Sequence, residues 1–186
     1  MSRFIVETTP LANLKIVRRT MLGDERGFLS RLFCSQELNA AGWTWPVAQI
    51  NHTYTRGRGT LRGLHYQNSP HAEDKLVSCI QGEVWDVAVD IRRDSPTFLH
   101  WFGQILSAQN HKAFLIPKGF AHGFQALTDE VQLVYLHSHP YHAASESGLF
   151  AQDPLLKIEW PLSISEISAR DQAHALLTDH YSGVTV

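Results

Sequence analysis

The sequence is poor in cysteine, and its cysteines are not arranged as pairs. Cys34 and Cys79 are the only two in 186 residues, and neither stands in a Cys-x-x-Cys motif. Disulfide frameworks and cysteine-rich zinc sites need several cysteines at close spacing. We therefore predict two reduced thiols and a cytoplasmic protein.

Long apolar runs and an excess of one charge are also missing. No segment approaches the roughly 18 consecutive apolar residues that a membrane-spanning helix needs. The opening residues, Met1 to Glu7, lack the apolar stretch of a signal peptide. The formal net charge is −2, whereas broad nucleic-acid binding requires a basic surface. We expect no membrane segment and no nucleic-acid partner, although clustered arginines leave room for a local anion site.

What the sequence does contain is a series of short apolar runs separated by glycine-rich turns. Its 44% of apolar residues suffice for the core of a single domain, residues 1–186. Strands are predicted over 4–8, 14–19, 28–34, 49–54, 60–66, 76–80, 84–91, 98–106, 113–116, 124–127 and 131–137. Two hairpins are expected, 49–54 with 60–66 and 76–80 with 84–91, and short helices at 35–41, capped by Ser35, and near 168–177. The pattern predicts an all-β antiparallel jelly roll whose interior is the natural ligand cavity.

The strand predicted around His65 carries the first candidate for chemistry. Strict alternation would put His65 on one face with Leu61, and Arg62 on the other. A histidine on a rigid strand can be a hydrogen-bonded core residue or a positioned proton-transfer group. The nearby Arg62 and Lys75 favour a functional role, because a guanidinium binds phosphate with two parallel hydrogen bonds.

A second candidate is His122, in Pro117-Lys118-Gly119-Phe120-Ala121-His122. This stretch resembles the second conserved motif of cupins, in which the histidine is a metal ligand. The first cupin motif supplies His-x-His, but the corresponding place here reads His65-Tyr66-Gln67. Because a tight site needs three or four nitrogen or oxygen ligands, we expect no metal. His122 is then a neutral hydrogen-bonding group in the pocket.

Three further side chains could complete an acid–base site. Tyr135 is either a barrel-wall aromatic or a phenol that donates a proton in a desolvated cavity, its pKa lowered by nearby cations. Tyr141 could stack on a ligand ring. Asp171 lies in the helix-start composition Ser168-Ala169-Arg170-Asp171, and it would orient His65 if the fold brings the two together.

In this order, the residues resemble the dTDP-4-dehydrorhamnose 3,5-epimerase family over nearly the whole chain. The motif Leu61-Arg62-Gly63-Leu64-His65 is specific to it. The supporting matches are Asp24 to Gly27, Gln49-x-Asn51, Lys75, Gly82 to Arg92, Ser95 to Phe98, Pro117 to Phe124, Tyr135, Tyr141, Asp153-Pro154, Trp160-Pro161 and Arg170-Asp171.

The resemblance implies a cupin-type jelly roll, usually a homodimer, that works on a nucleotide-linked 4-keto-6-deoxy sugar without metal or organic cofactor, as in rhamnose and polysaccharide biosynthesis. In such an enzyme a base removes the acidic hydrogen beside the C4 ketone, and an acid on the other face returns a proton, which inverts the carbon. The implied roles are His65 as base, Asp171 as its partner, Tyr135 as acid and Lys75 as enolate stabiliser. Substrate-binding positions are Arg62, Gln49, Asn51, His122, Tyr141, Arg170 and Arg26, which reaches across from the second subunit.

One segment departs from the family pattern. Leu29 stands where the family has phenylalanine, and Arg31 stands where it has glutamate, in a stretch that helps to bind the nucleotide. Replacing an acceptor by a cation reverses the local charge, which leaves open a CDP-, GDP- or UDP-linked sugar. Whether C3, C5 or both are inverted is open too, because the approach to the pocket at residues 136–140 is richer in histidine than usual.

Three competing functions remain at this point. A metal-dependent cupin oxygenase or isomerase is disfavoured because its ligand set would lack the second histidine of the His-x-His motif. A non-catalytic sugar-binding cupin would need neither His65 nor Tyr135. A 4-keto sugar 3,4-ketoisomerase shares the fold, but the match at those two residues favours the epimerase.

Overall fold

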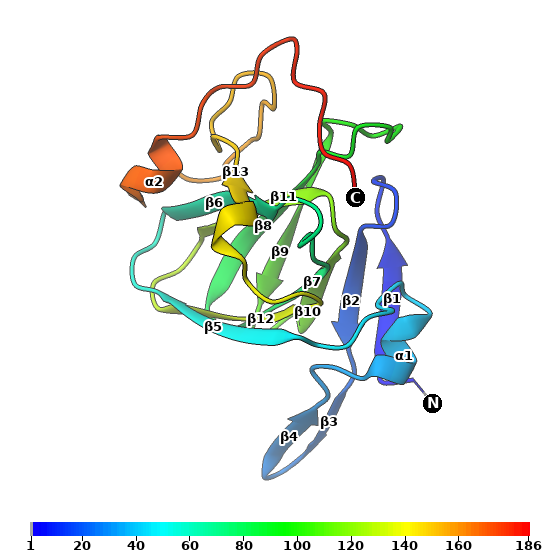
Figure 1. Ribbon diagram of the computed structural model, residues 1–186. Helices are drawn as coiled ribbons and strands as arrows, with labels where there is room; N and C mark the ends of the chain where they lie inside the picture. Colours follow the sequence, from blue (N-terminus) through cyan, green and yellow to red (C-terminus); the bar gives the residue numbers. More distant parts are fainter. Residues whose placement is uncertain (1) are drawn as a thin grey trace.

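A computed structural model describes residues 2–186, and Figure 1 shows two facing β-sheets with a hairpin projecting from one end. The first sheet has the order β1 (Phe4–Thr8), β2 (Lys15–Arg19), β10 (Lys112–Ile116), β7 (Lys75–Gln81), β12 (Val131–His137), β5 (Gln49–Thr55). The second has the order β13 (Glu146–Gly148), β6 (Thr60–Gln67), β11 (Phe120–Ala126), β8 (Glu83–Asp90), β9 (Trp101–Ser107), and the short β14 (Glu166–Ile167) runs parallel to β6. The predicted antiparallel jelly roll is confirmed.

The remaining elements are few and short. The projecting hairpin consists of β3 (Met21–Asp24) and β4 (Gly27–Ser30). In the part of the chain that the structure describes, helical structure is limited to α1 (Ser35–Asn39), the 3-10 turn η1 (Ala143–Ser145) and α2 (Ala169–Gln172). Among residues 2–186, no helix has the length and apolar character needed to cross a membrane.

The two predicted hairpins are wrong, because consecutive strands enter opposite sheets. β5 pairs with β12 while β6 pairs with β11, and β7 pairs with β10 and β12 while β8 pairs with β9 and β11. Each strand has an apolar face, and placing successive strands on facing walls buries both faces in one core. The corner at Gly82 is tight: its φ is +73°, and an added Cβ would lie 2.6 Å from Thr128 Oγ1.

Several predicted boundaries also shift. The strand expected over 28–34 ends at Ser30, and the following helix is preceded by Cys34, with no side-chain cap from Ser35. The strand over 98–106 is β9, and the strand over 124–127 begins earlier, at Phe120. The helix signal near 168–177 forms only one turn, in which the Ser168 hydroxyl accepts a hydrogen bond from the Asp171 backbone nitrogen at 3.0 Å.

An extra residue in β6 breaks the alternation expected for residues 61–67. His122 pairs with His65, but Phe124 pairs with Arg62, so two steps on β11 oppose three on β6. Such a bulge moves the side chains beyond it to the other face. Arg62 and His65 therefore both line the same cavity, and the prediction that they lie on opposite faces is wrong.

Glycines make room for this bulge. A Cβ on Gly63 would lie 2.5 Å from the Gly123 Cα, and a Cβ on Gly123 would lie 2.6 Å from the Arg62 carbonyl oxygen. Gly63 also has a φ of +123°, which side-chain-bearing residues rarely adopt. Gly63, two residues before His65, and Gly123, directly after His122, thus let β6 and β11 approach closely where those histidines lie opposite each other.

Both faces of β8 in the second sheet are buried. Val84 and Ala88 of β8 pack between the two sheets, whereas Val87 and Val89 pack with the C-terminal residues Leu156 and Ile167 on the outer side. The C-terminal segment therefore covers the outer face of β8. This covering brings α2 next to β6 (Figure 1).

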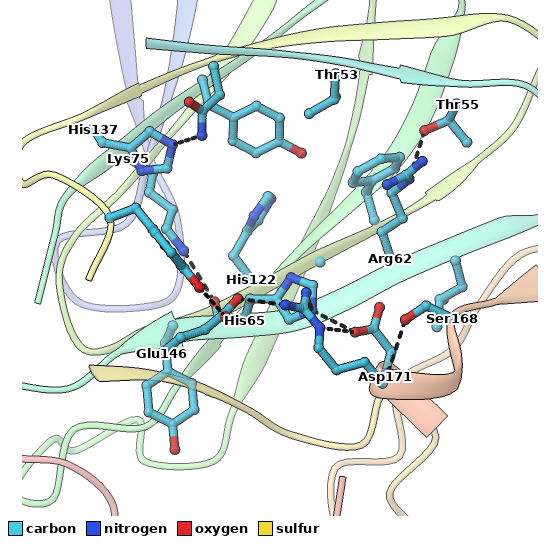
Figure 2. A pocket seen from close by; sticks show the side chains of 18 of the residues that line it. Thr53, Thr55, Arg62, His65, Lys75, His122, His137, Glu146, Ser168 and Asp171 are labelled. Carbon is cyan, nitrogen blue, oxygen red and sulfur yellow. Dashed lines mark hydrogen bonds and ion pairs between the residues drawn. The ribbon is translucent and has the colours of Figure 1, made fainter. Parts of the chain in front are cut away.

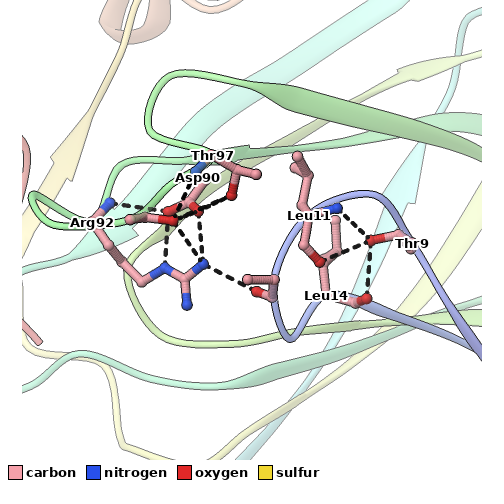
Figure 3. Close-up of polar contacts among 8 residues, drawn as sticks. Thr9, Leu11, Leu14, Asp90, Arg92 and Thr97 are labelled. Atoms are coloured by element: carbon pink, nitrogen blue, oxygen red, sulfur yellow. Dashed lines mark hydrogen bonds and ion pairs between the residues drawn. The ribbon is translucent and has the colours of Figure 1, made fainter.

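The end of β8 is closed by an ion pair that plays no part in the cavity. Arg92 binds Asp90 through two nitrogens, at 2.8 and 2.7 Å, and Thr97 donates to the same carboxylate at 2.7 Å (Figure 3). Arg92 also donates to the carbonyl of Ala12 at 3.0 Å, which ties this turn to the loop between β1 and β2. In that loop the Thr9 hydroxyl bonds the backbone of Leu11 and Leu14. Asp90, Arg92 and Thr97, which belong to the matched motifs, therefore have a structural role.

Candidate active site

A cavity of about 770 Å³ opens between the two sheets and brings together residues from seven strands and α2 (Figure 2). Ten of the thirteen predicted site residues line it: Gln49, Asn51, Arg62, His65, Lys75, His122, Tyr135, Tyr141, Arg170 and Asp171. β6 supplies His65 from one sheet, and β12 supplies Tyr135 from the other. An imidazole and a phenol thus enter one cavity from facing walls.

Asp171 lies directly behind His65. The His65 Nε2 atom is 2.8 Å from one carboxylate oxygen of Asp171, and the other oxygen accepts the backbone N–H of Gly63 at 3.1 Å. Because an ionised carboxylate only accepts hydrogen bonds, we assign the imidazole hydrogen to Nε2. Nδ1 has no hydrogen-bond partner among residues 2–186 and keeps a free lone pair.

The pKa directions agree with a neutral imidazole beside an ionised carboxylate. Burial lowers the pKa of His65, and this effect outweighs the raising effect of its hydrogen bond to Asp171. Burial alone would raise the pKa of Asp171, but hydrogen bonds from His65 and from the Gly63 backbone bring it below its ordinary value. At neutral pH the pair can therefore accept a proton at His65.

Arg170 connects this pair to the rim of the cavity. Its guanidinium lies 3.2 Å from His65 Nε2 and forms an ion pair with Glu146 at 2.9 Å. The other oxygen of Glu146 accepts a hydrogen bond from the Tyr141 hydroxyl at 2.8 Å. A chain of charged and hydrogen-bonded groups therefore runs from the His65–Asp171 pair to an aromatic ring that is exposed at the opening.

Lys75 approaches His65 from the neighbouring sheet. Its ammonium donates to the backbone carbonyl of His65 at 3.2 Å and pairs with Glu73 at 3.1 Å. The buried Gln67 amide donates to Glu73 at 2.9 Å. Lys75 is thus a buried cation held at the cavity wall, where it can stabilise negative charge that develops on a bound molecule.

Tyr135 keeps its proton. Burial, with a further contribution from the Asp86 carboxylate, raises the pKa of Tyr135 well above its ordinary value, against a lowering effect from Arg62. The expectation that nearby cations dominate is therefore wrong, since desolvation is the larger effect. A phenol that stays protonated at neutral pH can still donate a hydrogen bond or a proton.

A second histidine–carboxylate pair lies deeper in the barrel. His122 Nε2 is 2.7 Å from Asp86 Oδ1, and both side chains are almost fully buried. The His122 ring packs against Tyr135, with 5.8 Å between centroids and an edge-on geometry. His122 is therefore hydrogen bonded at the cavity wall.

Arg62 and the polar end of β5 line the outer part of the cavity. Arg62 donates to the Thr55 hydroxyl at 3.0 Å and to the Tyr54 carbonyl at 3.3 Å, which fixes its guanidinium. Gln49 donates to the Asn51 side-chain oxygen at 3.0 Å and accepts the Tyr141 backbone N–H at 2.9 Å. These fixed donors and acceptors can orient a polar ligand.

Three predicted residues are not part of this cavity. Arg26 lies in the turn of the β3–β4 hairpin, where it pairs with Asp24 at 2.5 Å, and Leu29 is 65% exposed on β4. Arg31 follows β4 and pairs with Glu37 of α1. Within one chain, the hairpin points away from the cavity (Figure 1).

Sequence reasoning missed several lining residues. His137 faces the cavity two positions after Tyr135, and burial lowers its pKa to about 4. Side chains two positions apart on a strand share a face, so Tyr135 predicts that His137 lines the cavity. By the same rule, Gln49 and Asn51 on β5 predict that Thr53 lines it. No local signal identifies Glu146, because it reaches the cavity only through the pairing of β13 with β6.

One group of possible metal-ligating side chains occurs in the described part of the chain. It consists of His65, Asp171 and His174, which offer one ligand atom each within 4.8 Å of one another. His122, which the cupin motif would use as a ligand, is not in this group and is bound to Asp86. The ligand set of a metal-dependent cupin is thus absent among residues 2–186.

Comparisons with known proteins agree with this geometry. A sequence model described as dTDP-4-dehydrorhamnose 3,5-epimerase matches residues 8–179. The dTDP-4-dehydrorhamnose 3,5-epimerase of Shigella flexneri is 43% identical over 88% of this chain and 90% of its own.

Two solved structures are similar over nearly the full length. The dTDP-6-deoxy-D-glucose-3,5-epimerase of Legionella pneumophila, in complex with dTDP-4-keto-L-rhamnose, is 41% identical with a TM-score of 0.91 and 98% coverage of both chains. The dTDP-4-dehydrorhamnose 3,5-epimerase of Bacillus anthracis, with TDP and PPi bound, is 40% identical with a TM-score of 0.90, covering 94% of this chain and 99% of its own.

Proposed function

The chain belongs to the dTDP-4-dehydrorhamnose 3,5-epimerase family and is an isomerase, and we propose that residues 1–186 act as one domain that inverts C3 and C5 of a dTDP-linked 4-keto-6-deoxy sugar. The observation that carries the assignment of the base is the His65–Asp171 contact of 2.8 Å. It leaves the Nδ1 lone pair of His65 unused in a cavity that also contains Tyr135.

In the first step, His65 would accept the proton from the carbon next to the ketone. Neutral imidazole is basic enough to accept this proton near neutral pH, and Asp171 stabilises the cation that forms. The electrons move from the C–H bond to the ketone oxygen, giving an enolate. The ammonium of Lys75, buried and fixed by Glu73, is placed to stabilise that oxygen.

In the second step, Tyr135 would return a proton to the opposite face of the same carbon. Its raised pKa keeps the phenol protonated until the enolate forms. Delivery from the face opposite to His65 inverts the centre, whereas return from His65 would regenerate the starting sugar. After inversion the tyrosinate must regain a proton before the second carbon reacts.

The outer part of the cavity would hold the nucleotide portion. Arg62 offers a fixed guanidinium for the diphosphate, and Tyr141, exposed at the opening, offers a ring for stacking. A dTDP-linked sugar is the ligand of the Legionella pneumophila relative. This supports dTDP over the CDP, GDP and UDP alternatives.

Hydrogen exchange with solvent tests the proposed function. The purified enzyme is incubated in deuterated water with dTDP-4-keto-6-deoxyglucose, and NMR follows the hydrogens on C3 and C5. We expect deuterium at both carbons and a product with both centres inverted. Exchange at C3 alone would restrict the activity to one centre, and no exchange with any nucleotide-linked 4-keto sugar would refute the proposal.

The active form would be a homodimer whose sites are completed across the interface. β5 is the last strand of its sheet, and it exposes Ile50 (63%) and Tyr54 beside the cavity. The projecting hairpin exposes Phe28 (68%) and Leu29. Uncovered apolar side chains on an edge strand and on a protruding hairpin are typical of an interface. In such a dimer, Arg26 of the partner subunit would contact the nucleotide, with Leu29 and Arg31 nearby.

Subunit complementation tests this arrangement. Co-expressed Arg26→Ala and His65→Ala chains should regain activity that neither variant has alone, because one site of the mixed dimer receives both intact residues. Co-expressed His65→Ala and Asp171→Asn chains are the matched control, since both substitutions affect the same chain's half of the site. Equal activity from the two mixtures, or a monomer by light scattering, would refute the shared site.

A further inference from the structure

His174 lies next to the proposed base but has no part in the proposed reaction. It follows α2, and its ring centroid is 6.3 Å from that of His65 in an edge-on arrangement. Its Nε2 atom is buried and has no hydrogen-bond partner in the described part of the chain. A buried nitrogen without a partner is unusual and requires an explanation.

The surroundings fix His174 at this position. A Cβ on Gly148 would lie 2.2 Å from His174 Nε2, so the glycine of β13 provides the space that the ring occupies. The same short strand pairs with β6, with Gly148 opposite His65. Gly148 thus lets the His174 ring approach the strand position that pairs with His65.

We propose that His65, Asp171 and His174 form an inhibitory binding site for a transition-metal cation such as Zn²⁺. One ligand atom from each lies within 4.8 Å of the others, and two imidazoles with one carboxylate are a ligand set that Zn²⁺ accepts. Water would complete the coordination. The inference rests on the proposed function, because it assigns an inhibitor to the same base.

Metal binding at this site would remove the basicity of His65. The imidazole nitrogen nearest Asp171 is Nε2, which now carries the hydrogen. When a metal takes the Nε2 lone pair of a neutral imidazole, the ring hydrogen moves to Nδ1. Nδ1 is the atom that would accept the substrate proton, so the metal-bound enzyme has no base.

Arg170 opposes the cation. Its guanidinium lies 3.2 Å from His65 Nε2 and 3.5 Å from Asp171 Oδ1, where it occupies the space and repels a positive ion. Its side chain is 59% exposed and can turn toward Glu146, with which it already pairs. Removing this charge should therefore strengthen metal binding, whereas removing His174 should weaken it.

Inhibition by Zn²⁺ tests the site directly. The enzyme, assayed in a non-chelating buffer, should be inhibited by Zn²⁺ and recover on addition of EDTA, and Mg²⁺ should have no effect because it prefers oxygen ligands. Half inhibition of His174→Gln should need at least about tenfold more Zn²⁺. Even the loss of a residue that only hydrogen-bonds a metal ligand lowers the metal affinity by about this factor. The activity of His174→Gln with EDTA should equal that of the unchanged enzyme. Arg170→Gln should be inhibited at lower Zn²⁺ concentrations than the unchanged enzyme. Inhibition of each variant is measured relative to its own rate without metal.

Cobalt absorption gives a readout that does not depend on turnover. Co²⁺ bound to two imidazoles and a carboxylate should absorb in the visible region, and the band should be lost in His174→Gln. Absence of inhibition, equal sensitivity of the unchanged enzyme and His174→Gln, or an unaltered cobalt band would each overturn the metal site. The proposed reaction needs no metal, so the unchanged enzyme should be active in EDTA. If it showed no turnover there, the proposed function would be refuted and not the metal site.

Discussion

The barrel contains two histidine–aspartate pairs on neighbouring strands, and they differ in how the carboxylate is satisfied. His65 and His122 lie opposite each other on β6 and β11, and their contacts to Asp171 and Asp86 measure 2.8 and 2.7 Å. Both oxygens of Asp171 are hydrogen bonded, whereas Asp86 Oδ2 is buried without a partner among residues 2–186. Similar contact distances therefore do not imply the same chemistry.

The pKa directions of the two carboxylates follow from this difference. Hydrogen bonds outweigh burial at Asp171, so its pKa falls, whereas burial dominates at Asp86 and its pKa rises. The side chain of His65 is 29% exposed to the cavity, and that of His122 is 5% exposed. The first pair combines an ionised carboxylate with a histidine that is open to the cavity, while the second is a buried hydrogen-bonded pair that packs behind Tyr135.

The largest expected effect separates the two histidines. His65→Gln should lower kcat by about 10²–10⁴-fold, the contribution of a well-placed general base. His122→Gln is the matched control, and it should retain most of the activity because the His122 side chain is buried and its Nε2 atom is held by Asp86. Steady-state rates and circular dichroism of both variants decide the comparison, and similar losses would remove the distinction between the pairs.

The second-largest effect on activity is expected for Asp171, the aspartate that contacts His65. Asp171→Asn should lower kcat/KM by roughly 10²-fold or more, since an orienting carboxylate also stabilises the imidazolium. Asp171 raises the pKa of His65, so its loss should move the acid limb of the pH–rate profile to lower pH. The profile is measured with EDTA present. An acid limb that stays in place would show that Asp171 does not interact with the base.

Tyr135→Phe tests whether the hydroxyl of Tyr135, whose ring packs against His122, is the proton donor. We expect a loss of about 10²-fold in product formation, at the lower end of the range for a general acid. The phenylalanine keeps the packing against His122, so the melting temperature should change little. A variant with full epimerase activity would require a different proton donor.

The smallest effect on activity is expected for Asp86→Asn, which keeps an acceptor for His122. Its effect on stability should depend on pH. The raised pKa of Asp86 means that the folded state binds this proton more tightly than the unfolded state, so its stabilising effect is present at low pH and is lost as pH rises through the folded pKa. Denaturant melts should favour the variant more at pH 8 than at pH 5, and the reverse trend would contradict a raised pKa.

Much of this arrangement could be predicted from the sequence, and the rest depends on contacts between distant segments. Period-two patterns give most strands, and motif residues such as His65 and Tyr135 stand on them. The bulge in β6 could not be predicted, because it results from the close approach of Gly63 to Gly123. The hairpin predictions failed because a tight turn does not reveal whether its two strands join one sheet or two.

The same limit applies to the site. Asp171 reaches His65 because the C-terminal segment packs over β6, and no local pattern in residues 168–177 encodes that contact. Glu146 and His174 enter through β13 and the segment after α2 in the same way. Residues that face the cavity by alternation, such as His137, were within reach of sequence reasoning.

Isotope exchange by the two single variants tests most directly the claim that His65 is the base. In deuterated water, Tyr135→Phe should still exchange a hydrogen beside the ketone without full inversion, because His65 can remove and return it from one face. His65→Gln should show no exchange above the rate without enzyme. Exchange that persists in His65→Gln, with the fold intact, would contradict the account.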